Sequence, residues 1–133
     1  MLKANEFGTF LIRIVLGATF LLHGLAKYQE GIGVVQDRFL NYNIPYADYV
    51  AYGVTFVEIV GGLFMIIGFT TRFVATLFSI IMIGAIVYVK FEIGFLQGYE
   101  IDVLLLAMSM ALLVAGSRFI ALDNFFVERK KKK

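Results

Sequence analysis

The stretch FGTFLIRIVLGATFLLHGLA, residues Phe7–Ala26, decides the fold class of this chain. It has the ~20 predominantly apolar residues that a helix needs to cross the ~30 Å hydrocarbon core of a bilayer. Three more apolar stretches follow it, at residues 50–69, 73–90 and 101–117. The sequence therefore predicts an all-α fold, an antiparallel bundle of four transmembrane helices in a polytopic membrane protein.

The composition agrees with this fold class. The chain has 133 residues, of which 60% are hydrophobic and 17% charged, and its mean hydropathy is +0.84. Soluble domains are nearer ~45–50% apolar and ~25% charged. Because the four spans and their connections use almost the whole sequence, we expect one membrane domain over residues 1–133.

Several kinds of redox and metal site are excluded by residue type. The chain has no cysteine, so it supplies no thiol for disulfide exchange and no thiolate for iron–sulfur or zinc ligation. Its one histidine, His23, rules out bis-histidine haem within a subunit. Carboxylates show no recognisable metal-binding spacing. We therefore expect no metal site and no intrinsic cofactor.

The distribution of lysine and arginine predicts the orientation. One side of the predicted bundle carries Lys3, Arg72, Arg118, Arg129 and Lys130–Lys133, eight cations; the other carries Lys27, Arg38 and Lys90, three. We expect both termini in the cytoplasm. The basic C-terminal run is expected to contact anionic lipid rather than nucleic acid.

Ionisable residues inside the apolar stretches are candidates for function, because each costs at least ~2.5–3.5 kcal/mol at membrane depth unless it is paired or wetted. Arg13 and His23 lie in the first stretch and Glu58 in the second. At 3.6 residues per turn, Arg13 shares a stripe with Gly17 and Lys27, which should face the other helices. We expect Arg13 and Glu58 to approach each other directly or through water, either as a ligand or proton site or as a structural clamp.

The connection Lys27–Tyr49 is expected to be a long external loop, and Phe91–Gly98 a flexible external turn. The tyrosines near the first loop predict either an interfacial belt or a lid over an outward-facing pocket. Asp102 has two interpretations, a polar group of the fourth span or a cap at its start.

Motifs at these positions carry a family resemblance. RIVLG at Arg13–Gly17 and FLLHGLAK at Phe20–Lys27 resemble the opening signature of the DoxX family. The other matching motifs are EIVGGLFMIIG at Glu58–Gly68, Thr71-Arg72, Gly98-Tyr-Glu100 and Gly116-Ser-Arg118 with Asp123. Four blocks in this order cover almost the whole chain.

The resemblance implies a four-helix membrane bundle with both ends inside, in a bacterial or archaeal plasma membrane. It also implies a link to oxidoreductases, membrane redox complexes, quinones or the response to oxidative stress. The family members that act on disulfides need cysteines, which this chain lacks.

Our leading functional hypothesis is a redox-linked membrane subunit that binds a quinone or similar small aromatic molecule within the bundle. Arg13 is predicted to bind a carbonyl oxygen or anionic ring, and His23 and Glu58 to exchange protons with the ligand. The predicted apolar walls of the pocket are Phe20, Phe56 and Met65. The predicted charges at its external end are Lys27, Lys90 and Glu100. The alternative for Lys90 and Glu100 is that they are solvated charges at the rim of the bundle.

Two other functions stay open. A non-enzymatic scaffold or assembly factor would recruit a soluble or membrane redox partner. A proton-coupled exporter is less favoured. Such exporters usually carry their membrane carboxylate in the first span, whereas Glu58 lies in the second. A homo-oligomer could form through Gly84 with Tyr88, or through the Ala107–Ala115 edge.

Overall fold

The computed structural model is all-helical within the part of the chain it describes, residues 4–117, 121–123 and 129. Its elements in chain order are α1 (Ala4–Glu30), α2 (Ile32–Asn41), α3 (Ala47–Ile67), α4 (Thr71–Gly84), the π-helices η1 (Ala85–Lys90) and η2 (Phe95–Tyr99), and α5 (Glu100–Ala115). Within the described residues, four helices are long and apolar enough to span a membrane: Ala4–Glu30, Ala47–Ile67, Thr71–Lys90 and Phe95–Ala115. The predicted four-helix membrane bundle is confirmed.

The first span is longer than residues 7–26, and the second begins and ends earlier than 50–69. Helix α1 continues to Glu30 because the first break in backbone conformation is at Gly31, with φ 108°. Helix α3 begins after Tyr46, which is left-handed, and ends at Gly68, which is also left-handed. The Phe69 N–H donates to the Phe64 carbonyl at 2.8 Å, the bond that closes a Schellman motif.

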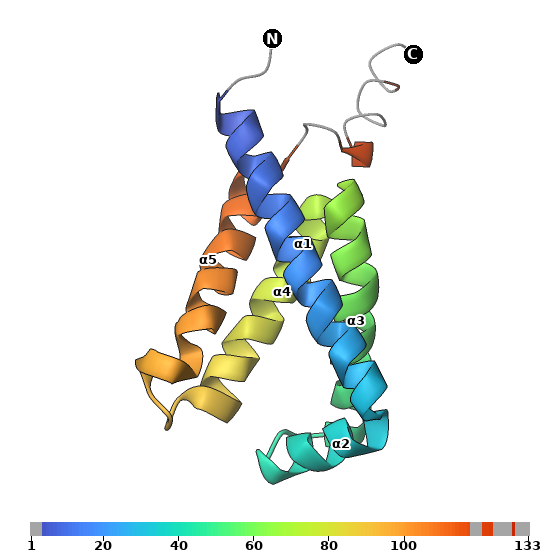
Figure 1. Ribbon diagram of the computed structural model, residues 1–133, viewed down its shortest axis with the longest axis vertical. Helices are drawn as coiled ribbons and strands as arrows, with labels where there is room; N and C mark the ends of the chain where they lie inside the picture. The colour runs from blue at the N-terminus through green and yellow to red at the C-terminus, as the bar shows by residue number, and fades with distance from the viewer. Residues whose placement is uncertain (1–3, 118–120, 124–128, 130–133) are drawn as a thin grey trace.

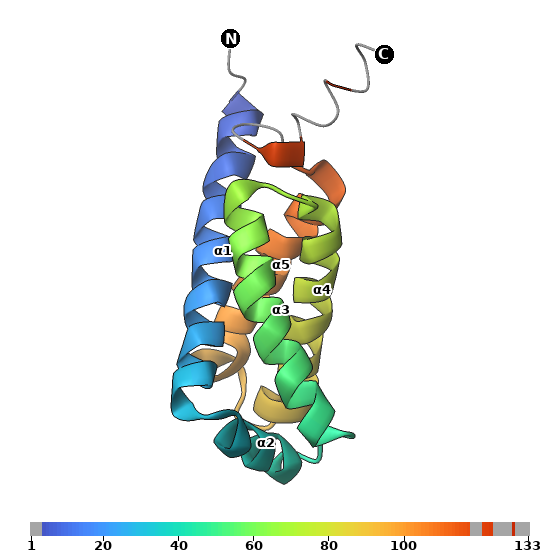
Figure 2. The same cartoon turned by 90° about the vertical axis from the view of Figure 1, so that its right-hand side faces the viewer.

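The prediction of a long loop between the first two spans is wrong, because this connection contains helix α2. This helix lies across one end of the bundle (Figures 1 and 2). Val35 and Phe39, one turn apart, are buried in a small cluster with Ala47 and Ala51 at the start of α3. Burial of these two side chains holds the short helix against the bundle. The connection before α5 does turn sharply, at Gly94 with φ 95° and Gln97 with φ 59°.

Helix α1 crosses α3 at glycines. A Cβ added to Gly17 would lie 2.9 Å from the Gly62 carbonyl oxygen, and one added to Gly62 would lie 2.8 Å from the Gly17 oxygen. About two turns further along α1, Gly24 lies against Glu58 and Ile59. Only residues without a side chain allow this approach. The predicted inward stripe of α1 is confirmed, because Arg13, Gly17 and Gly24 are all buried.

The bundle consists of two packed pairs, α1 with α3 and α4 with α5. The pairs converge near the end where α1 begins and α5 ends, and they diverge toward α2 (Figure 1). An apolar core joins them, with Phe20 stacked on Phe78 at 3.7 Å between ring centroids. The other buried members of this core include Leu16, Met65, Val74, Met82, Leu105 and Leu112.

The start of α1 and the end of α5 lie at one end of the bundle, as expected for four spans (Figure 2). That this end faces the cytoplasm stays a prediction. Lys3, Arg118 and Lys130–Lys133, on which the prediction partly depends, lie outside the described residues.

Asp123 caps the start of α4 from a distant part of the chain. Its carboxylate oxygens accept the backbone N–H of Thr70 at 2.7 Å and of Thr71 at 2.9 Å. Its own N–H donates to the Gly68 carbonyl at 3.0 Å. A carboxylate at this position satisfies otherwise unpaired N–H groups and lies favourably in the helix dipole.

We predict that Asp123→Ala lowers the free energy of unfolding in detergent micelles by about 1–2 kcal/mol, the value of a lost N-terminal cap. Asp48→Ala is the matched control. Asp48 lies in the first turn of α3, where no side chain caps the helix. Equal unfolding curves for the two variants would contradict the capping role.

Candidate functional site

A cavity of about 580 Å³ lies between the two helix pairs at the end covered by α2. Its wall is mainly apolar and comes from α1, α2, α3, the α4–η1 helix and α5. The polar and charged side chains that line it are His23, Lys27, Arg38, Tyr42, Glu58, Tyr88, Lys90 and Asp102. This combination of an apolar wall with a few convergent polar groups is typical of a small-molecule site.

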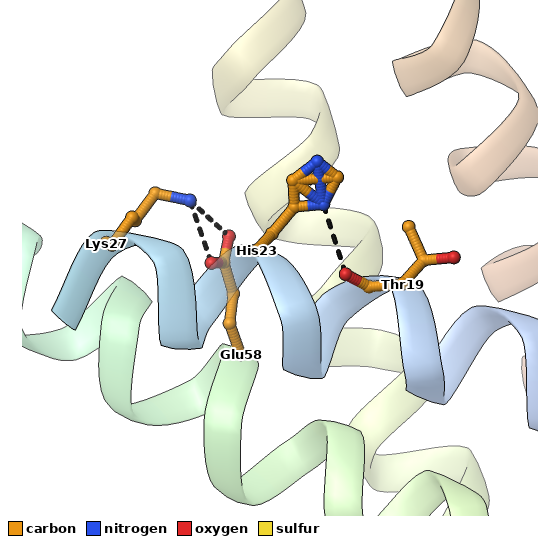
Figure 3. Close-up of polar contacts among 4 residues, drawn as sticks. All are labelled: Thr19, His23, Lys27 and Glu58. Carbon is orange, nitrogen blue, oxygen red and sulfur yellow. Dashed lines mark hydrogen bonds and ion pairs between the residues drawn. The ribbon is translucent and has the colours of Figure 1, made fainter. Parts of the chain in front are cut away.

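Glu58 and Lys27 form an ion pair across α1 and α3 (Figure 3). Lys27 Nζ donates to both carboxylate oxygens of Glu58, at 2.8 and 3.0 Å. The close approach at Gly24 brings the Cβ of Glu58 and the backbone nitrogen of Ile59 against α1, one turn before Lys27. The Glu58 side chain is 4% exposed and that of Lys27 is 20% exposed. The pair satisfies a carboxylate at membrane depth.

A second ion pair joins the other two spans. Lys90 Nζ, at the end of η1, lies 3.0 Å from Asp102 Oδ2 in the first turn of α5. Asp102 is 7% exposed and Lys90 is 33% exposed. The start of α5 has no side-chain cap, and its N-cap residue is Tyr99. Asp102 therefore lies in the first turn of α5, where a carboxylate is favourable in the helix dipole, and it is also the partner of Lys90.

His23 lines the same cavity. Its Nδ1 lies 3.1 Å from the Thr19 carbonyl oxygen on the preceding turn (Figure 3). Because a carbonyl oxygen only accepts, this hydrogen bond requires the proton on Nδ1 and leaves Nε2 for other partners. The charges that act on the ring are those of Lys27, Lys90 and Asp102. His23 thus lies within the field of both ion pairs.

Helix α2 forms the outer wall of the cavity with Arg38, Phe39 and Tyr42. Arg38 forms an ion pair with Glu30 at the end of α1, and Gln36 donates to the Asp48 carbonyl oxygen at 3.3 Å. These contacts tie α2 to the spans on either side of it. Of the tyrosines near this segment, Tyr42 lines the cavity, as expected of a lid. The neighbouring Tyr46, Tyr49 and Tyr52 are exposed, as in an interfacial belt.

Five of the nine predicted site residues line the cavity: Phe20, His23, Lys27, Glu58 and Lys90. Glu100 is not among the lining residues. Met65 is buried in the core. Phe56 is 65% exposed and lines an apolar groove of about 250 Å³ on the outer side of α3 and α4.

Arg13 lies at the opposite end of the bundle, so the predicted approach of Arg13 to Glu58 is wrong. The side chain is fully buried, and its Nη1 lies 3.4 Å from Ser117 Oγ. The negative charge of the Asp123 carboxylate acts on the Arg13 guanidinium. Because α1 and α3 are antiparallel and cross at Gly17 and Gly62, Arg13 is level with Ile66. That level is about 12 Å along the axis from Glu58, at ~1.5 Å per residue.

The prediction missed the contribution of α2 and of the second ion pair. Phe39 and Tyr42 could have been found from the apolar spacing of Val35 and Phe39, which is typical of a short helix buried on one face. Gly84 and Tyr88, considered above for a dimer, also line the cavity. The alternative dimer edge is exposed on α5, at Ala107, Ala111 and Ala115.

Comparison with known proteins places the chain in a family. The family model described as DoxX matches residues 8–91, which include the first three spans. A Bacillus subtilis (strain 168) protein named "Putative oxidoreductase CatD" is 40% identical over 131 residues, covering 98% of this chain and 96% of the relative. "Uncharacterized membrane protein Rv3486" of Mycobacterium tuberculosis (strain ATCC 25618 / H37Rv) is 37% identical over 79 residues, or 59% of this chain and 48% of that protein.

No solved structure matches the chain. The match to the Bacillus subtilis relative extends beyond the residues of the family model through the fourth span. On the family match and this full-length relative, the chain belongs to the DoxX family of membrane proteins.

Proposed function

We propose that this protein is the membrane subunit of a redox-linked system and binds a quinone or similar small aromatic molecule in the cavity between its helix pairs. The observation that carries the proposal is an apolar cavity lined by two lysine–carboxylate pairs and a histidine within the bundle. The name of the Bacillus subtilis relative supports an oxidoreductase context.

The size and wall of the cavity suit such a ligand. Its volume of about 580 Å³ falls within the ~300–1,000 Å³ range of small-molecule sites. Phe20 offers an aromatic surface that is fixed by stacking on Phe78. Tyr88 on η1 and Tyr42 beside α2 also line the cavity. Aromatic and aliphatic side chains therefore surround a space large enough for one or two fused rings.

The charged groups suit the chemistry. Reduction of a quinone takes up two electrons and two protons, one proton at each ring oxygen, and we assign the electrons to a partner redox protein. His23 would hold a proton on Nε2 and give it to one ring oxygen, since Nδ1 is engaged by Thr19, and the lysine ammonium at the other oxygen would give the second proton. Both groups would be reprotonated from water at the open end of the cavity. Lys27 and Lys90 would hold the oxygens by charge-assisted hydrogen bonds, and Glu58 and Asp102 keep the two ammonium groups in place.

The test is binding of 2-methyl-1,4-naphthoquinone to the full chain in lipid nanodiscs, with a variant that fills the cavity. Gly84 lines the cavity, and a Cβ added there meets no atom within 4 Å. We expect Gly84→Phe to weaken binding at least about tenfold, or ~1.4 kcal/mol, by occupying the space of the ligand.

Gly53→Phe is the matched control. Gly53 also has no atom within 4 Å of an added Cβ and is not a lining residue, so its affinity should equal that of the unmodified chain. Absence of binding by the unmodified chain, or equal affinity in both phenylalanine variants, would refute the proposal.

A further inference from the structure

The two ion pairs occupy equivalent places in the two halves of the bundle. Lys27 lies near the end of the first span and pairs with Glu58 on the second; Lys90 lies at the end of the third span and pairs with Asp102 on the fourth. Each pair thus joins two consecutive antiparallel spans. In membrane proteins built from two halves, ligands often bind where the halves face each other.

The two pairs belong to opposite walls of the cavity. Lys27 and Glu58 come from α1 and α3, and Lys90 and Asp102 from η1 and α5. The two helix pairs diverge at this end of the bundle, which places the cavity between them (Figure 1). A ligand in the cavity therefore has one lysine–carboxylate pair on each side.

Both members of each pair line the cavity, and in both pairs the cation is the more exposed member. The lysine side chains are 20% and 33% exposed, whereas the Glu58 and Asp102 side chains are 4% and 7% exposed. The more accessible group of each pair is therefore an ammonium. Because an ammonium has only donors, the complementary ligand group on each side is an acceptor.

Lys27, which makes two hydrogen bonds to its partner, still has an N–H group that can donate to a ligand. An ammonium has three N–H bonds, and Lys27 uses two of them for Glu58 Oε1 and Oε2. One remains for a ligand without breaking the ion pair. Lys90 makes a single ion contact, with Asp102 Oδ2. Each wall can therefore bind one oxygen acceptor while its carboxylate stays neutralised.

We propose that the cavity selects ring compounds with two oxygen acceptors on opposite edges, one held by Lys27 and the other by Lys90. This proposal rests on the proposed function and narrows its ligand class to para-dioxygenated rings. Phe20 on α1 and Leu105 on α5 also line the cavity and would pack against the ring. A ring with one oxygen satisfies only one wall.

The test compares two probes in nanodiscs that contain the full chain. The two-oxygen probe is 2-methyl-1,4-naphthoquinone, and the one-oxygen probe is 2-methyl-1-tetralone, which has a similar fused-ring size. We expect the one-oxygen probe to bind about tenfold more weakly, the loss expected for one charge-assisted hydrogen bond.

Paired substitutions remove each lysine without leaving a buried unpaired carboxylate. In Lys27→Met/Glu58→Gln and in Lys90→Met/Asp102→Asn, the two-oxygen probe should lose about tenfold in affinity each time. The one-oxygen probe should lose affinity in only one of the two variants. Lys27→Arg and Lys90→Arg, which keep the charge and the donors, should bind the two-oxygen probe within about threefold of the unmodified chain.

Two results would overturn this proposal while the proposed function stands: equal affinity of the unmodified chain for both probes, or a paired variant that leaves the affinity for the two-oxygen probe unchanged. If neither probe binds the unmodified chain, the proposed function fails as well. A thermal unfolding curve for each variant shows that the protein is folded when its affinity is measured.

Discussion

Replacing Gly62 by valine is expected to lower the free energy of unfolding by more than about 3 kcal/mol, at the upper end of the cost of overpacking. An added Cβ would lie 2.8 Å from both the Gly17 carbonyl oxygen and the Leu21 backbone nitrogen. These are backbone atoms of α1, so they cannot move aside as a flexible side chain can. The two helices must separate, and Lys27 then loses its contact with Glu58.

The matched control is Gly53→Val on the same helix. A Cβ at Gly53 meets no atom within 4 Å, so we expect a change within about 0.5 kcal/mol, as for a surface substitution. Both variants are compared by reversible unfolding in mixed detergent micelles. Similar stability of the Gly62 and Gly53 variants would show that the close crossing of α1 and α3 does not hold the bundle together.

Replacing Glu58 by alanine is expected to lower the free energy of unfolding by about 2–3 kcal/mol. Loss of one partner from a buried pair usually costs ~3–5 kcal/mol because the other charge is left unpaired. Here the Lys27 side chain is 20% exposed, so it can partly reach water and the cost is smaller. Lys27→Met/Glu58→Gln should recover most of the loss, because it leaves no unpaired charge.

Glu30→Ala is the control for this experiment. Glu30 also pairs with a cation, Arg38, but both side chains are more than a third exposed, and exposed pairs contribute only ~0–1 kcal/mol. We expect a loss below about 1 kcal/mol in the same unfolding assay. If Glu58→Ala were no more destabilising than Glu30→Ala, the pair with Lys27 would contribute to binding alone.

The four spans could be predicted because each depends only on its own sequence, as a run of apolar residues long enough to cross a membrane. Helix α2 could not be found this way. It is ten residues long, too short to be stable alone, and it is held by burial of Val35 and Phe39 against the start of α3. Helix α2 therefore depends on a contact with the start of α3, and a hydropathy profile evaluates these two segments separately.

The site was predicted in part for a similar reason. Helical periodicity gives the face on which a residue lies, so Phe20, His23, Lys27 and Glu58 were correctly placed toward the bundle. It does not give the depth at which two helices meet. The crossing at Gly17 and Gly62 sets that depth, and it aligns Glu58 with Gly24 rather than with Arg13. The carboxylate therefore pairs with the lysine at the helix end.

The stack of Phe20 on Phe78, with Leu16, Met65 and Leu112 beyond it, has a consequence for bioenergetics. This apolar layer lies between the cavity and the end of the bundle that holds Arg13, and the buried hydroxyls of Ser79 and Ser109 each donate to a carbonyl of their own helix. On the proposed function, a ligand in the cavity would therefore exchange protons with the aqueous phase at the end covered by α2 rather than across the whole bundle.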